Sequence, residues 1–193
     1  MLRGLYDWTM NIAAHRHARW GLATVSFVES SFFPIPPDVV LIPMVLSKRE
    51  SAWANALICT VASVAGAMLG YAIGFFLYDT VGQAILNLYG YTDKFEDFAR
   101  RFNEYGAWIV LIAGFTPFPF KVITIASGVT QLNLAVFIIA SIVARGARFF
   151  LLAALLWYFG PPVRAFIERY FGLLTIVFMV LLIGGFVAAA YLF

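Results

Sequence analysis

Long apolar blocks separated by short polar intervals dominate this chain. Residues 54–78 and 171–193 contain no charged side chain, and residues 133–159 contain only two. A transmembrane helix needs about 20 consecutive, predominantly apolar residues. Each of these three blocks is therefore predicted to be a transmembrane helix. In the first of them Gly66, Gly70 and Gly74 recur at four-residue spacing, a pattern that predicts close packing of another helix.

Two further apolar blocks, residues 20–47 and 107–130, are interrupted by prolines. A proline inside a helix removes a backbone hydrogen bond and clashes with the preceding turn. Broken backbone is tolerated at membrane depth only where protein or a wet cavity covers it. We predict that each block is a re-entrant helical hairpin, entering and leaving on one side of the membrane. The predicted breaks lie at Pro34, Pro36, Pro37, Pro117 and Pro119.

The two proline-containing blocks resemble each other. Pro34 and Pro36 correspond to Pro117 and Pro119, which lie 83 residues later, and Asp38 corresponds at the same offset to Lys121. The segments that follow are also alike, because Ala-Ser-Val-Ala-Gly-Ala at 62–67 resembles Ala-Ser-Ile-Val-Ala-Arg at 140–145. Repeated units with broken helices are typical of transporters. Chance similarity between apolar segments is the alternative.

The charged intervals predict the topology. Basic residues flank the first hairpin and follow the block at 133–159, whereas residues 79–106 carry five acids against three bases. Cytoplasmic loops carry the excess of Lys and Arg. The N-terminus is then cytoplasmic, the C-terminus is periplasmic or external, and the hairpins enter from opposite faces.

The predicted fold is a single all-α integral membrane domain, built as an inverted repeat of a re-entrant hairpin plus a transmembrane helix. An N-terminal interfacial helix precedes the repeat and a C-terminal transmembrane helix follows it. The segments are an amphipathic helix at 1–19, hairpin 1 at 20–47, a transmembrane helix at 54–78, an external amphipathic segment at 79–106, hairpin 2 at 107–130, and transmembrane helices at 133–159 and 171–193.

Composition agrees with a membrane protein and argues against several functions. Apolar residues make up 63% of the chain and charged residues 12%, against about 45–50% and 25% in soluble domains. The net charge of +3 comes from scattered bases, so no nucleic-acid surface is expected. Cys59 is the single cysteine, and His15 and His17 lack a third ligand. We therefore expect neither a metal site nor a cofactor.

Five ionisable residues fall at membrane depth: Glu29, Asp38, Lys121, Arg145 and Arg148. Charges there are costly and usually functional. The repeat suggests an Asp38–Lys121 pair, and Arg145 and Arg148 share one helix face. Guanidinium and ammonium groups suit a phosphate headgroup, while Glu29 and Asp38 could relay protons. Alternatively, the acids neutralise the bases and hold the bundle together.

Signatures of an enzyme are absent from the sequence. It contains no Gly-x-Ser-x-Gly and no His-Glu-x-x-His motif, and Ser30, Ser31 and Ser127 lack a histidine base within the apolar blocks. These motifs place a nucleophile or a metal-bound water beside a base. The protein is therefore not expected to be an enzyme.

The residues resemble the DedA family, also called SNARE-associated or VTT-domain membrane proteins, in a divergent small bacterial branch. The resemblance rests on Glu29 with Phe32 to Asp38, on the small-residue segment from Ala62 to Tyr71, and on Phe115-Thr116-Pro117 leading to Gly128. It implies opposed re-entrant hairpins and a role in moving lipids across membranes. Bacterial members of the family have been linked to flipping undecaprenyl phosphate or phosphatidylethanolamine, and eukaryotic relatives to lipid scrambling.

The resemblance also implies roles for particular residues. The acids of the family's first hairpin correspond to Glu29 and Asp38. The family's second hairpin typically carries two arginines around Phe-x-Pro, and here those positions hold Gly114 and Phe120. Lys121 remains nearby, and Arg145 and Arg148 are candidates to replace the missing arginines.

The sequence thus predicts a flippase-like or scramblase-like transporter in the bacterial inner membrane, with proton coupling left open. Its partners would be membrane lipids with an anionic or phosphate-bearing headgroup. One alternative is a proton-coupled antiporter of small solutes or ions, and another is a non-transporting scaffold that organises the membrane. The sequence leaves open whether the chain forms a homo-oligomer.

Overall fold

The computed structural model describes residues 18–31, 36–89, 92–116, 119–160 and 162. These residues are helical apart from short turns, and none of them forms a β-strand, which confirms the predicted all-α class for this part of the chain. The elements are α2 (Ala18–Ser31), α3 (Asp38–Ser47), the 3-10 helix η1 (Arg49–Ser51), α4 (Ala52–Leu77), the π-helix η2 (Tyr78–Gly82), α5 (Gln83–Tyr89), α6 (Thr92–Phe115), α7 (Phe120–Val129) and a last long helix, Leu134–Gly160.

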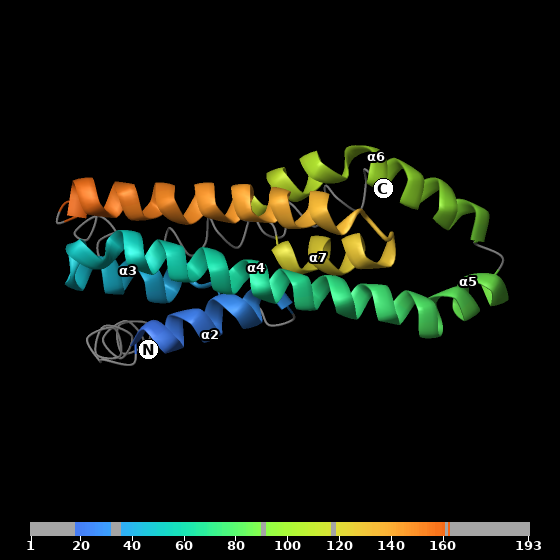
Figure 1. Cartoon of the computed structure of the whole chain (residues 1–193), viewed down its shortest axis with the longest axis horizontal. Helices are drawn as coiled ribbons and strands as arrows, with labels where there is room; N and C mark the ends of the chain where they lie inside the picture. The colour runs from blue at the N-terminus through green and yellow to red at the C-terminus, as the bar shows by residue number, and fades with distance from the viewer. Residues whose placement is uncertain (1–17, 32–35, 90–91, 117–118, 161, 163–193) are drawn as a thin grey trace.

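Two long helices lie along the long axis of the molecule (Figure 1). One combines η1, α4 and η2 over Arg49–Gly82, the other is Leu134–Gly160, and both are long and apolar enough to cross a membrane. They lie antiparallel, since Trp53 contacts the rings of Phe150 and Trp157, whereas Ser63, ten residues later, accepts from Arg145, which lies earlier in the other helix. At one end the Arg49 guanidinium lies against Gly160, where it complements the partial negative charge of a helix C-terminus.

The first helical pair, α2 and α3, packs on the N-terminal half of α4 (Figure 1). α2 runs parallel to α4, because Leu22 packs in the cluster that contains Ala52 while Ser31, nine residues later, donates a hydrogen bond to the Gly66 carbonyl at 3.0 Å. Pro37 precedes α3, where a proline is compatible with the first turn. α3 then returns to the start of α4, so the pair begins and ends at one end of the molecule.

The second helical pair, α6 and α7, lies at the other end of the molecule (Figure 1). Asn103 Nδ2 of α6 donates to the Thr130 carbonyl at 2.8 Å, just beyond the end of α7. The last helix starts in the following turn, where the Asn133 side chain accepts from the backbone N–H groups of Ala135 and Val136 at 3.0 and 3.2 Å. This is a side-chain N-cap. The second pair therefore begins and ends at the end opposite to the first.

Close approach of both pairs depends on the glycine face of α4. A Cβ added at Gly66 would overlap the Phe27 carbonyl of α2, and one at Gly74 would overlap the Ile125 carbonyl of α7. Gly70 faces the Thr124 side chain of α7 and the Ser30 carbonyl of α2. The predicted close packing is confirmed, and the packing partners are α2 and α7.

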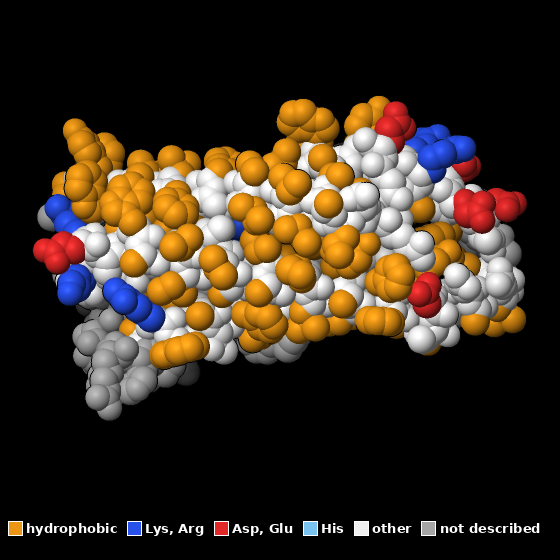
Figure 2. Space-filling model, viewed as in Figure 1, with side chains coloured by type: hydrophobic (Ala, Val, Ile, Leu, Met, Phe, Trp, Pro, Cys, Tyr) orange, Lys and Arg blue, Asp and Glu red, His pale blue; other side chains and the backbone are white. Residues whose placement is uncertain are grey.

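Charged and apolar side chains separate along the long axis. Figure 2 shows hydrophobic side chains over the middle of the visible face and charged ones at its two ends. Exposed apolar residues on the two long helices include Leu57, Val61, Ile139 and Val143. An apolar belt between charged ends is the surface expected of a chain that spans a bilayer.

The structure also differs from the predicted segment limits. The limit placed between 106 and 107 lies inside α6, which is one continuous helix from Thr92 to Phe115. The predicted helices at 1–19 and 171–193 lie outside the described residues, apart from Ala18 and Arg19, which begin α2. Pro34, Pro117, His15 and His17 also lie outside them.

Candidate functional site

Two arginine–carboxylate pairs join the first helical pair to the last long helix. Arg145 Nη2 donates to Glu29 Oε2 of α2 at 2.7 Å. One turn later Arg148 Nη2 pairs with Asp38 Oδ2, on the first residue of α3. Both arginines lie near the middle of Leu134–Gly160. The structure thus gathers four of the five ionisable residues predicted at membrane depth into one site.

Arg145 is enclosed on every side that the structure describes. Only 2% of its side chain is exposed. Its Nε donates to Ser63 Oγ of α4 at 2.6 Å, and its guanidinium lies over the rings of Phe120 and Phe149, 5.0 and 4.7 Å from their centroids. Stacking on aromatic rings and ion pairing together stabilise a buried guanidinium.

Serines extend this network into α2. The hydroxyls of Ser30 and Ser63 lie 2.6 Å apart, and Ser30 Oγ donates to Glu29 Oε2 at 3.1 Å. The Ser30 carbonyl also accepts from Thr124 Oγ1 of α7 at 3.2 Å. Side chains from α2, α4, α7 and the last helix therefore meet at one point, where α2 and α7 approach each other.

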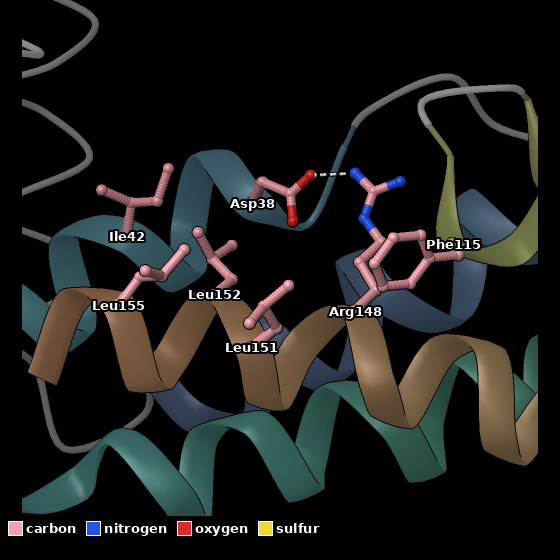
Figure 3. A pocket seen from close by; sticks show the side chains of 7 residues that line it. All are labelled: Asp38, Ile42, Phe115, Arg148, Leu151, Leu152 and Leu155. Carbon is pink, nitrogen blue, oxygen red and sulfur yellow. Dashed lines mark hydrogen bonds and ion pairs between the residues drawn. The ribbon is translucent and has the colours of Figure 1, made fainter.

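Arg148 has a more open environment than Arg145. Its Nη1 donates to the Thr116 carbonyl at 2.9 Å, and its side chain and that of Asp38 are each 20% exposed. A partly open cavity of about 320 Å³ lies beside the pair. Figure 3 shows Asp38 and Arg148 joined at one part of the cavity wall, with Phe115 beside Arg148 and leucine and isoleucine side chains beyond Asp38.

The Asp38–Arg148 pair leaves hydrogen-bonding capacity unused. Asp38 Oδ1 is buried and has no partner among the described residues. A guanidinium has five N–H donors, and two from Arg148 have acceptors in the described part of the chain. The cavity wall therefore offers the N–H donors of Arg148 to a ligand, while Asp38 Oδ1 is buried behind it.

Lys121 does not pair with Asp38. It lies in the first turn of α7 and is partly exposed, and its ammonium makes no ion pair with the described residues. The ion pairing proposed as an alternative for the acids is present in the geometry, with Arg145 and Arg148 as the bases. Among the remaining predicted positions, Pro36 and Pro37 precede α3, and Pro119 precedes α7.

The sequence did not single out the residues that surround Arg145. Ser63 belongs to the small-residue segment of α4, and Phe120 occupies a position where the family resemblance places an arginine, but nothing in the sequence marks either residue, or Phe149, as a partner of Arg145. A serine among small residues in an apolar helix is a polar group that needs a partner. That requirement is the one sequence feature that pointed toward a nearby donor.

Comparison with known proteins identifies the family. Residues 35–158 match the family model of the VTT domain. The chain belongs to the VTT-domain family, also known as the DedA family. The match contains Asp38, Arg145 and Arg148, and begins after Glu29. Proteins of the VTT-domain family are membrane proteins, which agrees with the two long apolar helices.

Two curated relatives align with this chain over most of their own length and most of its length. The VTT-domain chain is 42% identical to an uncharacterised protein of Haemophilus influenzae over 165 residues, covering 86% of the chain and 85% of the relative. It is 38% identical to an uncharacterised protein of Histophilus somni over 161 residues, covering 83% and 84%. No solved structure matches the chain.

Proposed function

We propose that this VTT-domain protein moves a phospholipid or a polyprenyl-phosphate lipid across the bacterial inner membrane. The observation that carries the proposal is the partly exposed Arg148 guanidinium, which lines a cavity near the middle of a membrane-protein helix. A charge at such depth is costly unless it serves a substrate or an ion. The phosphate of a lipid headgroup is a fitting bidentate ligand for it.

The arrangement of the helical pairs supports a carrier. In our proposal α2 and α3 form the first re-entrant hairpin, α6 and α7 form the second, and the hairpins enter from opposite faces. Their approach through Thr124 and the Ser30 carbonyl lies close to the arginine site. Inverted repeats that meet at a midplane site are the architecture of many secondary transporters.

The two arginines have different roles in this proposal. Arg148 contacts the headgroup, because it borders the cavity and keeps N–H groups without described partners. Arg145 positions the helices, because it is buried against Ser63, Glu29 and two aromatic rings. Lys121 adds a second cation for the headgroup. Asp38 accepts a proton when phosphate replaces it on Arg148, and Glu29 stays paired with Arg145.

Both arginines also stand in for the arginines that the family resemblance places on the second hairpin. The guanidinium of Arg145 lies over the ring of Phe120, one of the two residues found where the family pattern has an arginine. At the other, Gly114, an added Cβ would meet Ala144 and the same ring. Arg148 binds the carbonyl of Thr116 between them. Positive charge is thus supplied to the second pair from the last long helix.

Reconstitution in liposomes with fluorescent phospholipid or polyprenyl phosphate tests the function. The protein with its native sequence should expose inner-leaflet label to an external quencher faster than empty liposomes do. Arg148→Ala should reduce that rate at least about tenfold, a loss of about 1.4 kcal/mol in the transition state, and Asp38→Asn and Lys121→Ala should reduce it less. Arg100→Ala is the matched control, since Arg100 is exposed on α6 and its one ion pair within the described part of the chain is with Asp97. Equal rates for all variants would refute the charged site.

A non-transporting scaffold is the second candidate, favoured by the ion pairs that join helices far apart in sequence. A scaffold needs a stable contact between these helices but no charge on the cavity wall. The double variant Asp38→Leu with Arg148→Met replaces the pair with apolar side chains, so it should keep the fold and a scaffold's function, whereas lipid movement should be lost because the cavity wall no longer carries a guanidinium. A proton-coupled antiporter would show substrate-driven proton flux without lipid movement.

A further inference from the structure

The cavity beside Asp38 and Arg148 is polar at one place and apolar elsewhere. Its other walls are Ile42 of α3, Phe115 of α6, and Leu151, Leu152 and Leu155 of the last helix. Figure 3 shows the two charged groups together, with the leucines and Ile42 following in the direction away from Phe115. The cavity therefore has a charged end and an apolar length.

The apolar length runs along the helices. Leu151 and Leu152 follow Arg148 by three and four residues, and Leu155 follows Leu152 by three. Residues at these spacings share one face of a helix. From Arg148 to Leu155 the helix rises by about 10 Å at 1.5 Å per residue. Because this helix is one of the two that can cross the membrane, the groove lies along the direction in which a lipid chain extends.

Size and surroundings limit the occupant. A volume of about 320 Å³ is at the lower end of the range for ligand pockets, roughly 300–1,000 Å³. It can take one hydrocarbon chain but not a complete two-chain lipid. Since the cavity is partly open, the rest of a bound lipid can stay in the bilayer.

Charge complementarity decides which molecule fits both ends. A small polar solute would bind Arg148 but leave the leucine wall without a contact. An alkane would cover the leucines but leave the remaining guanidinium N–H groups of Arg148 without acceptors, and polar groups out of water are costly when unpaired. A phosphate attached to a hydrocarbon chain satisfies both ends.

We propose that this groove is a chain-binding site, in which one hydrocarbon chain of a phosphate-bearing lipid lies along Ile42, Leu151, Leu152 and Leu155 while its phosphate contacts Arg148. The inference rests on the proposed function and adds to it that the protein, rather than the bilayer alone, holds the chain while the headgroup is at the arginine.

A photoreactive lipid analogue tests the groove without requiring transport. Dodecyl phosphate with a diazirine at the end of its chain is cross-linked to the purified protein in detergent, and labelled peptides are identified by mass spectrometry. Label should concentrate around Leu155 and Ile42. Leu152→Trp and Leu155→Trp each fill the groove and should lower this label several-fold. Leu155 is 45% exposed, so its variant tolerates a larger side chain even if the Leu152 variant does not fold.

Leu57→Trp is the matched control, because Leu57 is 55% exposed on α4 and does not line the groove. It should leave the label unchanged. Unlabelled dodecyl phosphate should compete with the probe, and glycerol 3-phosphate, which has the phosphate without the chain, should not.

The proposed chain-binding site would be refuted if the label spread evenly over exposed leucines. It would also be refuted if both tryptophan variants were labelled as strongly as the native protein. Competition by glycerol 3-phosphate as strong as that by dodecyl phosphate would overturn it too. These outcomes concern binding alone. Absence of lipid movement by the native protein in liposomes would instead refute the proposed function, so the two failures are distinguishable.

Discussion

Arg145 and Arg148 lie three residues apart on one helix face, yet their surroundings differ. Arg145 is 2% exposed and its partners come from α2, α4, α7 and its own helix, whereas Arg148 is 20% exposed and borders the cavity. Equal charge and equal spacing therefore do not mean equal roles. Burial between an ion pair, a serine and two aromatic rings favours a structural role, and a position on the cavity wall favours contact with a ligand.

Removing Arg145 should destabilise the protein strongly. Arg145→Ala leaves Glu29 with only 15% of its side chain exposed and no guanidinium partner, and breaking a buried pair by removing one member costs about 3–5 kcal/mol. Thermal unfolding in detergent would measure the loss. The double variant Glu29→Gln with Arg145→Met should recover much of the stability, because neither change leaves a buried charge. A double variant less stable than Arg145→Ala would contradict this explanation.

At the residue scale the sequence predicted which residues matter better than it predicted their partners. Costly charges in apolar blocks selected Glu29, Asp38, Lys121, Arg145 and Arg148, and four of them meet in the structure. The expected Asp38–Lys121 pair is absent and Asp38 pairs with Arg148 instead. Spacing along one helix fixes which side chains share a face, but it contains no information on how neighbouring helices rotate against each other.

At the scale of elements, glycines in α4 set how closely the two helical pairs approach. Gly66→Ala should destabilise the protein by about 1–3 kcal/mol or more, the range for overpacking, because the added methyl group overlaps a backbone carbonyl that cannot move alone. Gly74→Ala should act likewise. Gly21→Ala is the control, since nothing lies within 4 Å of its added Cβ, and alanine favours helix over glycine by about 1 kcal/mol. Equal unfolding temperatures for Gly66→Ala and Gly21→Ala would contradict this packing.

Helix limits were harder to predict than helix packing. The change from charged to apolar sequence near residue 106 suggested a boundary, but α6 continues through Gly106 because that glycine packs against Leu132 and one glycine does not end a helix. The four-residue glycine spacing, in contrast, is a property of one helix face and needs no knowledge of the partner. Hence the sequence predicted that another helix packs closely on α4, and the structure shows that the packing partners are α2 and α7.

At the scale of the whole molecule, the charges at its two ends predict its orientation. The end that holds Lys48 and Arg49 should be cytoplasmic and the end that holds the first turns of α6 external, following the bias of Lys and Arg to the inside. Cys59 is buried in an apolar cluster, so Cys59→Ala gives a background without thiols and adds no hydroxyl to that cluster. Into it we would place Glu50→Cys or Glu96→Cys, both at exposed positions.

A membrane-impermeant maleimide added to intact bacteria should label the Glu96→Cys protein and should label the Glu50→Cys protein only after the inner membrane is permeabilised. The maleimide must cross the outer membrane to reach Glu96→Cys. Labelling of a known periplasmic protein with an exposed cysteine is the positive control for that step. Labelling in the reverse order would invert the proposed topology, and labelling of both positions in intact cells would contradict a membrane-spanning α4.

In the proposed function, the two ion pairs would also set how the protein responds to the membrane potential. Each pair has no net charge, so a rearrangement that carries both pairs intact through the membrane performs almost no electrical work. Proton uptake by Asp38 would leave Arg148 as an uncompensated positive charge, and moving one such charge across the whole membrane is worth about 2.3 kcal/mol per 100 mV. An anionic phosphate bound to Arg148 would cancel that charge again. Protonation and lipid binding together thus set whether the voltage assists or opposes a movement of the site.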